Sequence, residues 1–254
     1  MQRRDSWWVS PLSFVLLFSA FGLWATFRAF DNDHYLTVAP MHYLSPFYSP
    51  TIFLPWKLGS LSISPAILIL PFPLSFRLSC YYYRKSIYRG YLADPPGCAV
   101  VEPGPLRKAR FRRYTGERAF PFIVQNFHRY AFAAAVVFIA LLWKDTVDAF
   151  LFTDKGVTHF GVAVGSLVFL ANILLLTCYT FSCHSWRHLV GGSMDCYSCS
   201  AMDRTRYGLW KKVSFLNERH GLWAMTSLVS VALVDVYVFL VTSGILKDVR
   251  IFNL

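Results

Sequence analysis

Long apolar segments dominate the hydrophobic pattern of this chain. Five of them reach the roughly 20 residues that an α-helix needs to cross a bilayer. They lie at about Trp7–Phe27, Leu61–Tyr82, Ala119–Leu142, Phe160–Cys183 and His220–Leu246. The pattern therefore predicts an all-α, polytopic bundle of five transmembrane helices that forms a single domain over residues 1–254.

Two of these segments carry further signals. The first is longer than the apolar core of a cleaved signal peptide, so we expect it to be retained as a helix. The second contains Pro65, Pro71 and Pro73, which predict a kink because proline removes a helical hydrogen bond. Between them lies a proline- and aromatic-rich stretch, residues 31–59, which we expect to cap one end of the bundle.

The composition agrees with a membrane protein and locates its charge. The chain is 55% hydrophobic and 15% charged, with a formal net charge of +11 and a mean hydropathy of +0.40. Lysine and arginine gather in two loops, about 85–118 and 187–219. By the positive-inside rule these loops and the N-terminus are cytoplasmic and the C-terminus is periplasmic, in a multi-pass protein of the inner membrane. Charge confined in this way argues against nucleic-acid binding and suits lipid headgroups or an acidic partner.

The six cysteines do not read as a disulfide framework. All are expected in the cytoplasmic loops or the cytoplasmic halves of helices, where thiols stay reduced. Their arrangement therefore favours metal ligation or packing over disulfide bridges. Cys196 and Cys199 have the spacing of a metal site, which only Cys98 could extend to a third thiol.

A short motif occurs twice. Segments 79–84 and 182–187 both read Ser-Cys-x-x-x-Arg at the end of an apolar stretch. Each is followed by a basic loop and then by a helix with an early histidine, His128 in one case and His220 in the other. The unit helix–Cys–loop–His–helix is therefore repeated, which suggests pseudo-symmetry.

The cysteines and histidines of this repeat are expected to converge. At 1.5 Å per residue, Cys80 and Cys183 lie about 6 Å inside the level of the following arginine. His220 lies near the start of its helix, and His128 lies deeper, roughly 10–14 Å along a helix that begins near residue 119. Two thiols and two imidazoles then meet in the inner third of the bundle.

Three chemistries suit this donor set. Two thiolates and two imidazoles can hold a tetrahedral zinc ion, or a [2Fe–2S] cluster with two cysteines on one iron and two histidines on the other. Haem b is the alternative, held by two histidines from the inner end. The histidines available for it are His128, His184, His188 and His220. A transporter or structural protein without a redox centre also remains open.

Ionisable residues within apolar segments are functional candidates. Arg77 and Arg129 could hydrogen-bond a quinone or tune a redox centre, or pair with helix carbonyls. Asp235 interrupts the last apolar segment, and the sequence assigns it no partner.

Four motifs together resemble a known family. They read Ser-Cys-Tyr-Tyr-Tyr-Arg-Lys, Asn-x-His-Arg-Tyr, Cys-His-Ser-x-Arg-His-x-x-Gly-Gly and Asn-Glu-Arg-His. With five helices, they are similar to the single membrane-anchor subunit of succinate dehydrogenase, respiratory complex II. The resemblance is closest to the class whose five-helix anchor holds a Rieske-type [2Fe–2S] cluster in place of haem.

The resemblance implies a function. A flavoprotein subunit oxidises succinate, an iron–sulfur subunit passes the electrons on, and the anchor delivers them to quinone, so the chain is not catalytic alone. Carried over residue by residue, the cluster ligands are Cys80, His128, Cys183 and His220, with His184 as an alternate ligand. The chain lacks the Cys-x-His and Cys-x-x-His loops of soluble Rieske domains. The residues expected near the quinone are Tyr83, Arg84, Arg129, Trp186, Arg187 and His188.

Overall fold

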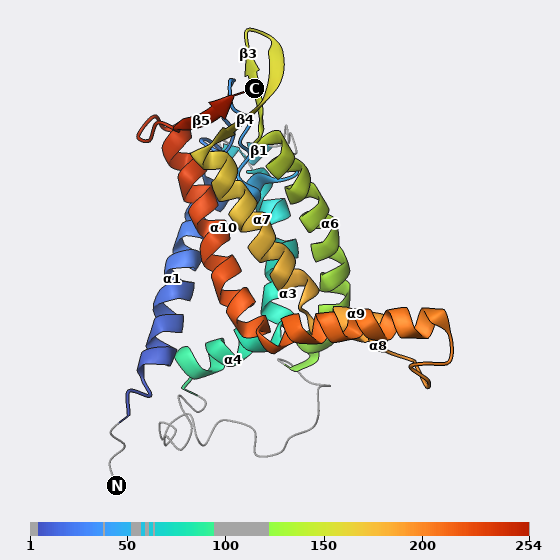
Figure 1. The fold of residues 1–254 in the computed structure, drawn as a ribbon. Coiled ribbons are helices and arrows are strands. Elements are labelled where there is room, and N and C mark those ends of the chain that lie inside the picture. The colour runs from blue at the N-terminus through green and yellow to red at the C-terminus, as the bar shows by residue number, and fades with distance from the viewer. Residues whose placement is uncertain are drawn as a thin grey trace.

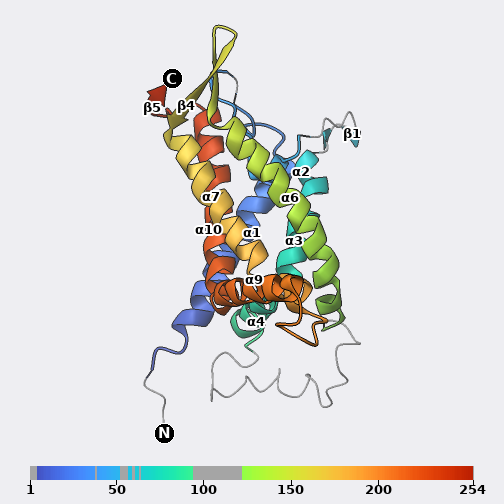
Figure 2. The ribbon, with the colours of Figure 1, turned by 45° about the vertical axis from the view of Figure 1, so that its right-hand side comes forward.

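The computed structural model describes residues 5–37, 39–51, 57–58, 61–62, 64–93 and 122–253. Four helices in these residues are long and apolar enough to cross a membrane. They are α1 (Val9–Phe30), α6 (His128–Asp148), α7 (Val164–Phe181) and α10 (His220–Thr242). They run side by side along the long axis of the molecule (Figures 1 and 2), with α7 packed against both α6 and α10. This confirms the prediction of a mostly helical membrane bundle.

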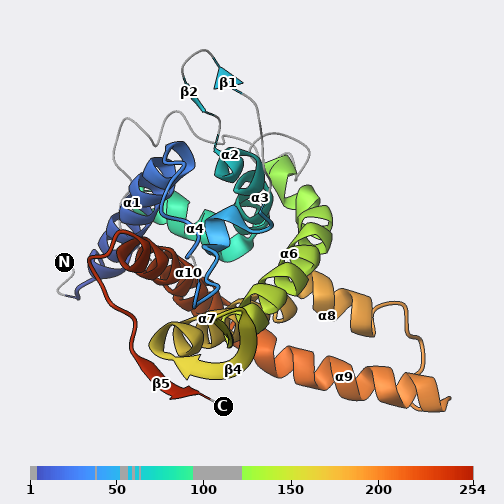
Figure 3. The same ribbon diagram turned by 90° about the horizontal axis from the view of Figure 1, so that it is seen from above.

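The fifth predicted segment forms a shorter, broken helix. It consists of α2 (Pro65–Ile69) and α3 (Pro71–Ser79), which meet at Leu70. Pro71 stands at the first position of α3, so the expected proline kink is present. The pair lies between α1 and α6, with α3 packed along α6 (Figures 2 and 3). Its 15 residues, Pro65–Ser79, are fewer than a typical span, and a fifth crossing stays a prediction.

The two ends of the bundle differ, and we call them the basic end and the sheet end. The basic end carries α4 (Tyr81–Gly90), α8 (His184–Gly191) and α9 (Ala201–Glu218). These helices lie crosswise to the spans, and α8 and α9 project sideways as a hairpin (Figures 1 and 3). Much of the two predicted basic loops is therefore helical, although residues 94–118 lie outside the described part.

The sheet end holds structure that the hydrophobic pattern does not predict. Strands β3 (Leu151–Asp154), β4 (Val157–Ala163) and β5 (Arg250–Asn253) form an antiparallel sheet. The turn between β3 and β4 uses positive φ angles at Lys155 and Gly156, which glycine adopts at little cost. The predicted helix start at Phe160 is therefore wrong, because residues 157–163 pair with β3 and β5 before α7 begins.

Other boundaries also move. Leu61 lies in β2 (Leu61–Ser62), which pairs with β1 (Lys57–Leu58), rather than in a helix. Helix α6 begins at His128, after the 3₁₀ helix η2 (Phe122–Phe127). His128 is therefore the first residue of its span and not a deeper one, just as His220 is the first residue of α10.

The stretch before β1 covers the sheet end of the bundle, as expected. It contains the short 3₁₀ helix η1 (Pro46–Tyr48), and the rings of Tyr43, Phe47 and Tyr48 are fully or almost fully buried. The two described parts of this stretch, 31–37 and 39–51, close over the ends of α1 and α10 (Figure 1).

Asp235 finds its partners at the sheet end. Its carboxylate accepts hydrogen bonds from Arg28 Nε at 3.1 Å and Trp24 Nε1 at 2.7 Å, and from the hydroxyl of Ser45. Both members of the Arg28–Asp235 ion pair are completely buried. A buried charge is tolerated when it is paired and hydrogen-bonded, so this acid has a structural explanation that the sequence alone did not supply.

Candidate functional site

Two thiol–imidazole pairs lie at the basic end of the bundle. Cys80 Sγ is 3.5 Å from His220 Nε2, and Cys183 Sγ is 2.9 Å from His128 Nε2. Both cysteines and His220 are almost fully buried. The structure thus brings together the four residues singled out from the repeat, in two pairs that each join one half of the chain to the other.

A serine hydroxyl contacts the Nδ1 atom of each imidazole. Ser79 Oγ lies 2.9 Å from His128 Nδ1, and Ser182 Oγ lies 2.7 Å from His220 Nδ1. Each serine hydroxyl already donates to a carbonyl of its own helix, Ser79 to Ser75 at 2.7 Å and Ser182 to Tyr179 at 3.0 Å.

These contacts fix the histidine tautomers. A hydroxyl has one hydrogen, so a serine that donates to a carbonyl can only accept from the imidazole. The hydrogen of each neutral ring therefore sits on Nδ1, and the lone pair of Nε2 faces a thiol. A metal ligand oriented by a hydrogen bond through its other nitrogen has this arrangement.

The backbone places both thiols in the same way. Cys80 and Cys183 have extended conformations, with ψ angles of 134° and 143°, and each caps the short crosswise helix that follows. In both cases the helical hydrogen-bond pattern resumes four residues later, at Arg84 and Arg187. The Ser-Cys-x-x-x-Arg motif is thus a helix break that turns the chain sideways and leaves a thiol at a helix N-terminus.

An aromatic ring lies four residues before each cysteine and stacks on a histidine. Phe76 stacks on His128, with centroids 4.9 Å apart and planes 6° apart. Tyr179 stacks on His220 at 5.2 Å and 17°. The repeat therefore includes an aromatic position, and the two halves differ there by one hydroxyl group.

The four donors do not surround a single metal ion. Among the described residues, no three or more His, Cys, Asp or Glu side chains lie close enough together to hold a single metal ion. The four donors form two separate pairs instead. Each pair joins one thiol to one imidazole, whereas a Rieske-type centre has two cysteines on one iron and two histidines on the other. The four donors fit that centre in kind, and binding it would regroup them as Cys80 with Cys183 and His128 with His220.

Arg77 is a buried cation beside this site. Its side chain is 8% exposed, and its guanidinium lies 5.0 Å from the ring centre of Tyr179 and 5.5 Å from that of Tyr83. It donates to the Ala224 carbonyl at 3.3 Å and to the hydroxyls of Ser227 and Tyr83. None of the ion pairs in the described part of the chain involves it.

The residues expected near a quinone fall into two groups. Tyr83 and Arg84 are buried, and the Tyr83 hydroxyl is engaged with Arg77 and Ala224. The other four lie at the same end and are partly or largely exposed. They are Arg129, Trp186, Arg187 and His188. The ring of Trp186 packs on those of Phe132 and Phe181.

Two sequence interpretations change at the α8–α9 hairpin. His184, the alternate ligand, is exposed, and its ring faces His188 at 6.4 Å between centroids. Cys196 and Cys199 form a disulfide, so the expectation that all cysteines stay reduced is wrong here. The two residues are close enough in the loop before α9 for their sulfurs to bond directly, which excludes them as metal ligands in this state. Cys98 lies outside the described residues.

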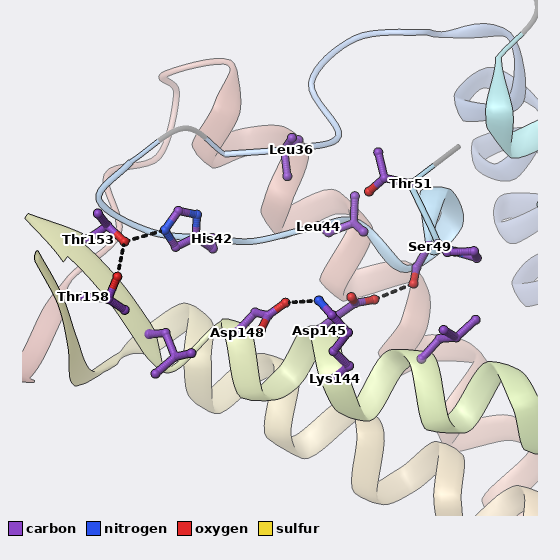
Figure 4. Close-up of a pocket in the computed structure, with 13 residues that line it drawn as sticks. Leu36, His42, Leu44, Ser49, Thr51, Lys144, Asp145, Asp148, Thr153 and Thr158 are labelled. Atoms are coloured by element: carbon purple, nitrogen blue, oxygen red, sulfur yellow. Dashed lines mark hydrogen bonds and ion pairs between the residues drawn. The ribbon is translucent and has the colours of Figure 1, made fainter. Parts of the chain in front are cut away.

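A cavity with several polar side chains lies elsewhere. It has a volume of about 620 Å³ and opens at the sheet end between the first loop, α6 and the β3–β4 hairpin (Figure 4). Its polar side chains are paired with each other: Lys144 with Asp148, Asp145 with Ser49, and His42 with Thr153. These pairs account for the polar side chains that line the cavity without a ligand.

Sequence reasoning missed the serines and the aromatic residues of the site. Both were visible in the repeat, because serine precedes each cysteine and an aromatic residue stands four positions before it. Their roles depend on which histidine each one contacts, and that requires the packing of α3 on α6 and of α7 on α10.

Known proteins support an assignment for the whole chain. A family profile described as "Actinobacterial succinate dehydrogenase subunit SdhC" matches residues 9–244. A chain of the solved Mycobacterium smegmatis Sdh1 complex in the apo form is 40% identical, with 99% of this chain and 94% of that chain covered and a TM-score of 0.82. No curated protein sequence matches. The chain belongs to the family of actinobacterial SdhC membrane subunits of succinate dehydrogenase.

Proposed function

We propose that this subunit relays electrons to quinone through a Rieske-type [2Fe–2S] centre held by Cys80, Cys183, His128 and His220. As an SdhC subunit, it belongs to a succinate dehydrogenase complex with flavoprotein and iron–sulfur partner subunits, in a membrane. A relay inside the membrane subunit would connect the iron–sulfur partner to quinone dissolved in the bilayer.

The observation that carries this proposal is the orientation of the two imidazoles. Ser79 and Ser182 hold the Nδ1 hydrogens, so both Nε2 lone pairs face thiols that lie at helix N-termini. Metal-ligating histidines are usually fixed in this way through their second nitrogen. When bound, a cluster with this donor set supplies one-electron transfer at a potential higher than that of all-cysteine clusters.

The rest of the basic end suits partner docking and quinone access. The crosswise helices expose lysines and arginines that fit an acidic face of the iron–sulfur subunit or anionic lipids. The exposed groups Arg129, His184 and His188 can donate hydrogen bonds to a quinone headgroup that arrives from the lipid. In the proposed relay, donor, centre and acceptor would all meet at the basic end of the bundle.

The test is iron and acid-labile sulfide analysis of the purified complex, with EPR of the reduced state. Wild type should contain one [2Fe–2S] centre more than the partner subunits account for. Cys80→Ser and Cys183→Ser should each remove it. Cys178→Ser is the matched control, because Cys178 is a free, half-buried cysteine on α7, five residues before Cys183. An unchanged iron content in both ligand variants would disprove the proposal.

A haem-b centre remains the second candidate, because His128 and His220 both lie at the basic end of the spans. A sharp α band in the visible spectrum of the reduced complex would favour it. The contact of each Nε2 with a thiol favours the cluster instead, since thiols have no role in bis-histidine haem ligation.

A further inference from the structure

The main polar differences between the two halves of the site are the charge of Arg77 and the hydroxyl of Tyr179. In the first half, residues 76–80 read Phe-Arg-Leu-Ser-Cys, and in the second, residues 179–183 read Tyr-Thr-Phe-Ser-Cys. The serines, cysteines and stacked rings correspond position by position. Arg77 corresponds to Thr180, and it places a charge on one side only.

Resting on the proposed function, we propose that Arg77 is the residue that sets the reduction potential of the centre. Its positive charge stabilises the electron that the centre accepts, and the Tyr179 hydroxyl assists it. Arg77 acts through the electric field and is a positioning residue of the centre, not a ligand.

Charge counting gives the sign of the effect. Two ferric ions are balanced by two sulfides and two thiolates, and neutral imidazoles add nothing, so the oxidised centre is neutral. One electron from the iron–sulfur partner reduces one ferric ion to ferrous and leaves one negative charge. A nearby fixed cation stabilises that charged state and raises the potential.

The surroundings of Arg77 make its charge effective. It is buried with no carboxylate partner in the described chain, and it interacts electrostatically with the Cys80 thiol. Its contacts are two aromatic rings, two hydroxyls and one carbonyl, all of which are neutral. A single unpaired buried charge is costly, and a centre that becomes negative would offset part of this cost. Arg84 on α4 is a second buried cation at this end and interacts electrostatically with His128. Its counterpart in the repeat is Arg187, so both halves carry a cation at that position.

Tyr179 adds a weakly paired donor. Its side chain is 1% exposed, its hydroxyl makes no hydrogen bond of standard geometry within the described residues, and the Cys80 thiol is its weak partner. A buried hydroxyl with no stronger partner requires an explanation. A cluster sulfur on the Cys80 side would accept this hydrogen, and hydrogen bonds to sulfur are among the factors that set cluster potentials.

The experiment is an EPR-monitored redox titration of the complete complex. Arg77→Gln should make reduction about tenfold less favourable, a fall of about 59 mV for a one-electron couple. Arg77→Lys should stay near wild type because it keeps the charge. Tyr179→Phe, which gives both histidines a stacked phenylalanine ring, should also lower the potential. Lys85→Gln is the matched control, since Lys85 is a half-exposed cation over the exposed ring of Tyr81.

Ser227→Asp covers the case in which Arg77→Gln does not assemble. Ser227 Oγ lies 3.3 Å from Arg77 Nη1, so a carboxylate there neutralises the arginine without removing it, and the potential should fall as in Arg77→Gln. A potential unchanged in Arg77→Gln or Ser227→Asp, at full cluster content, overturns the inference. Absence of the cluster signal from wild type instead overturns the proposed function.

Discussion

Replacing Ser79 or Ser182 with alanine tests the structure of the site most directly. Each serine is almost completely buried, 3% and 0% exposed, and accepts the Nδ1 hydrogen of a histidine whose Nε2 faces a thiol. Without the serine, that hydrogen has lost its partner inside the protein. The ring then either keeps an unsatisfied donor or moves the hydrogen to Nε2, where it blocks ligation.

Two independent estimates agree on the magnitude. An unsatisfied buried donor costs about 1–3 kcal/mol. Loss of an outer partner of a metal-bound histidine typically lowers metal affinity by about 10–100-fold, and each factor of ten is about 1.4 kcal/mol. Ser79→Ala and Ser182→Ala should therefore weaken iron retention by about 1.4–2.8 kcal/mol each.

The assay is the iron and sulfide content of the purified complex over a range of chelator concentrations. Ser75→Ala is the matched control, because Ser75 lies one turn earlier on α3 and its hydroxyl bonds only to the Phe72 carbonyl. If the Ser79 and Ser182 variants retain iron as well as the Ser75 variant does, the tautomer argument is refuted.

Three further predictions concern the fold. Arg28→Met should destabilise the complex by about 3–5 kcal/mol because it leaves Asp235 buried and unpaired. Thermal unfolding measures this loss, and the double variant Arg28→Met with Asp235→Leu should recover much of it. Gly191→Ala should destabilise the α8–α9 hairpin by about 1–3 kcal/mol, because the added Cβ would lie 2.1 Å from the Trp210 ring. Gly208→Ala should not destabilise it, because a Cβ there meets open space, and limited proteolysis distinguishes the two variants. Arg250 lowers the pKa of Asp154, so the bridge between β3 and β5 is present above the ordinary pKa of an aspartate, about 3.9, and is lost as the pH falls through the lowered value. Amide exchange at β5 should rise there in wild type and show no such dependence in Arg250→Gln.

The sequence predicted what depends on long, regular patterns. Apolar length was enough to find α1, α6, α7 and α10, because a bilayer imposes one requirement on every span. The repeat around Cys80 and Cys183 was enough to select the donor set, since its spacing is local. These features required no knowledge of which helices are neighbours.

What the sequence did not predict depends on contacts between distant segments. The β3–β4–β5 sheet pairs residue 163 with residue 250. The sequence of β4 is largely apolar, so by pattern it cannot be distinguished from the start of the span that follows. The Arg28–Asp235 pair joins the first and last helices. The disulfide between Cys196 and Cys199 was rejected on the expected compartment alone, although the spacing allowed it.

The exchange of partners between the two halves bears on how the subunit matures. Each half orients its own imidazole through its own serine, yet the thiol opposite that imidazole comes from the other half. A nascent chain that has emerged as far as α8 has the Cys183–His128 couple and lacks the Cys80–His220 couple. Under the proposed function, assembly of the centre would have to await insertion of the final helix, α10.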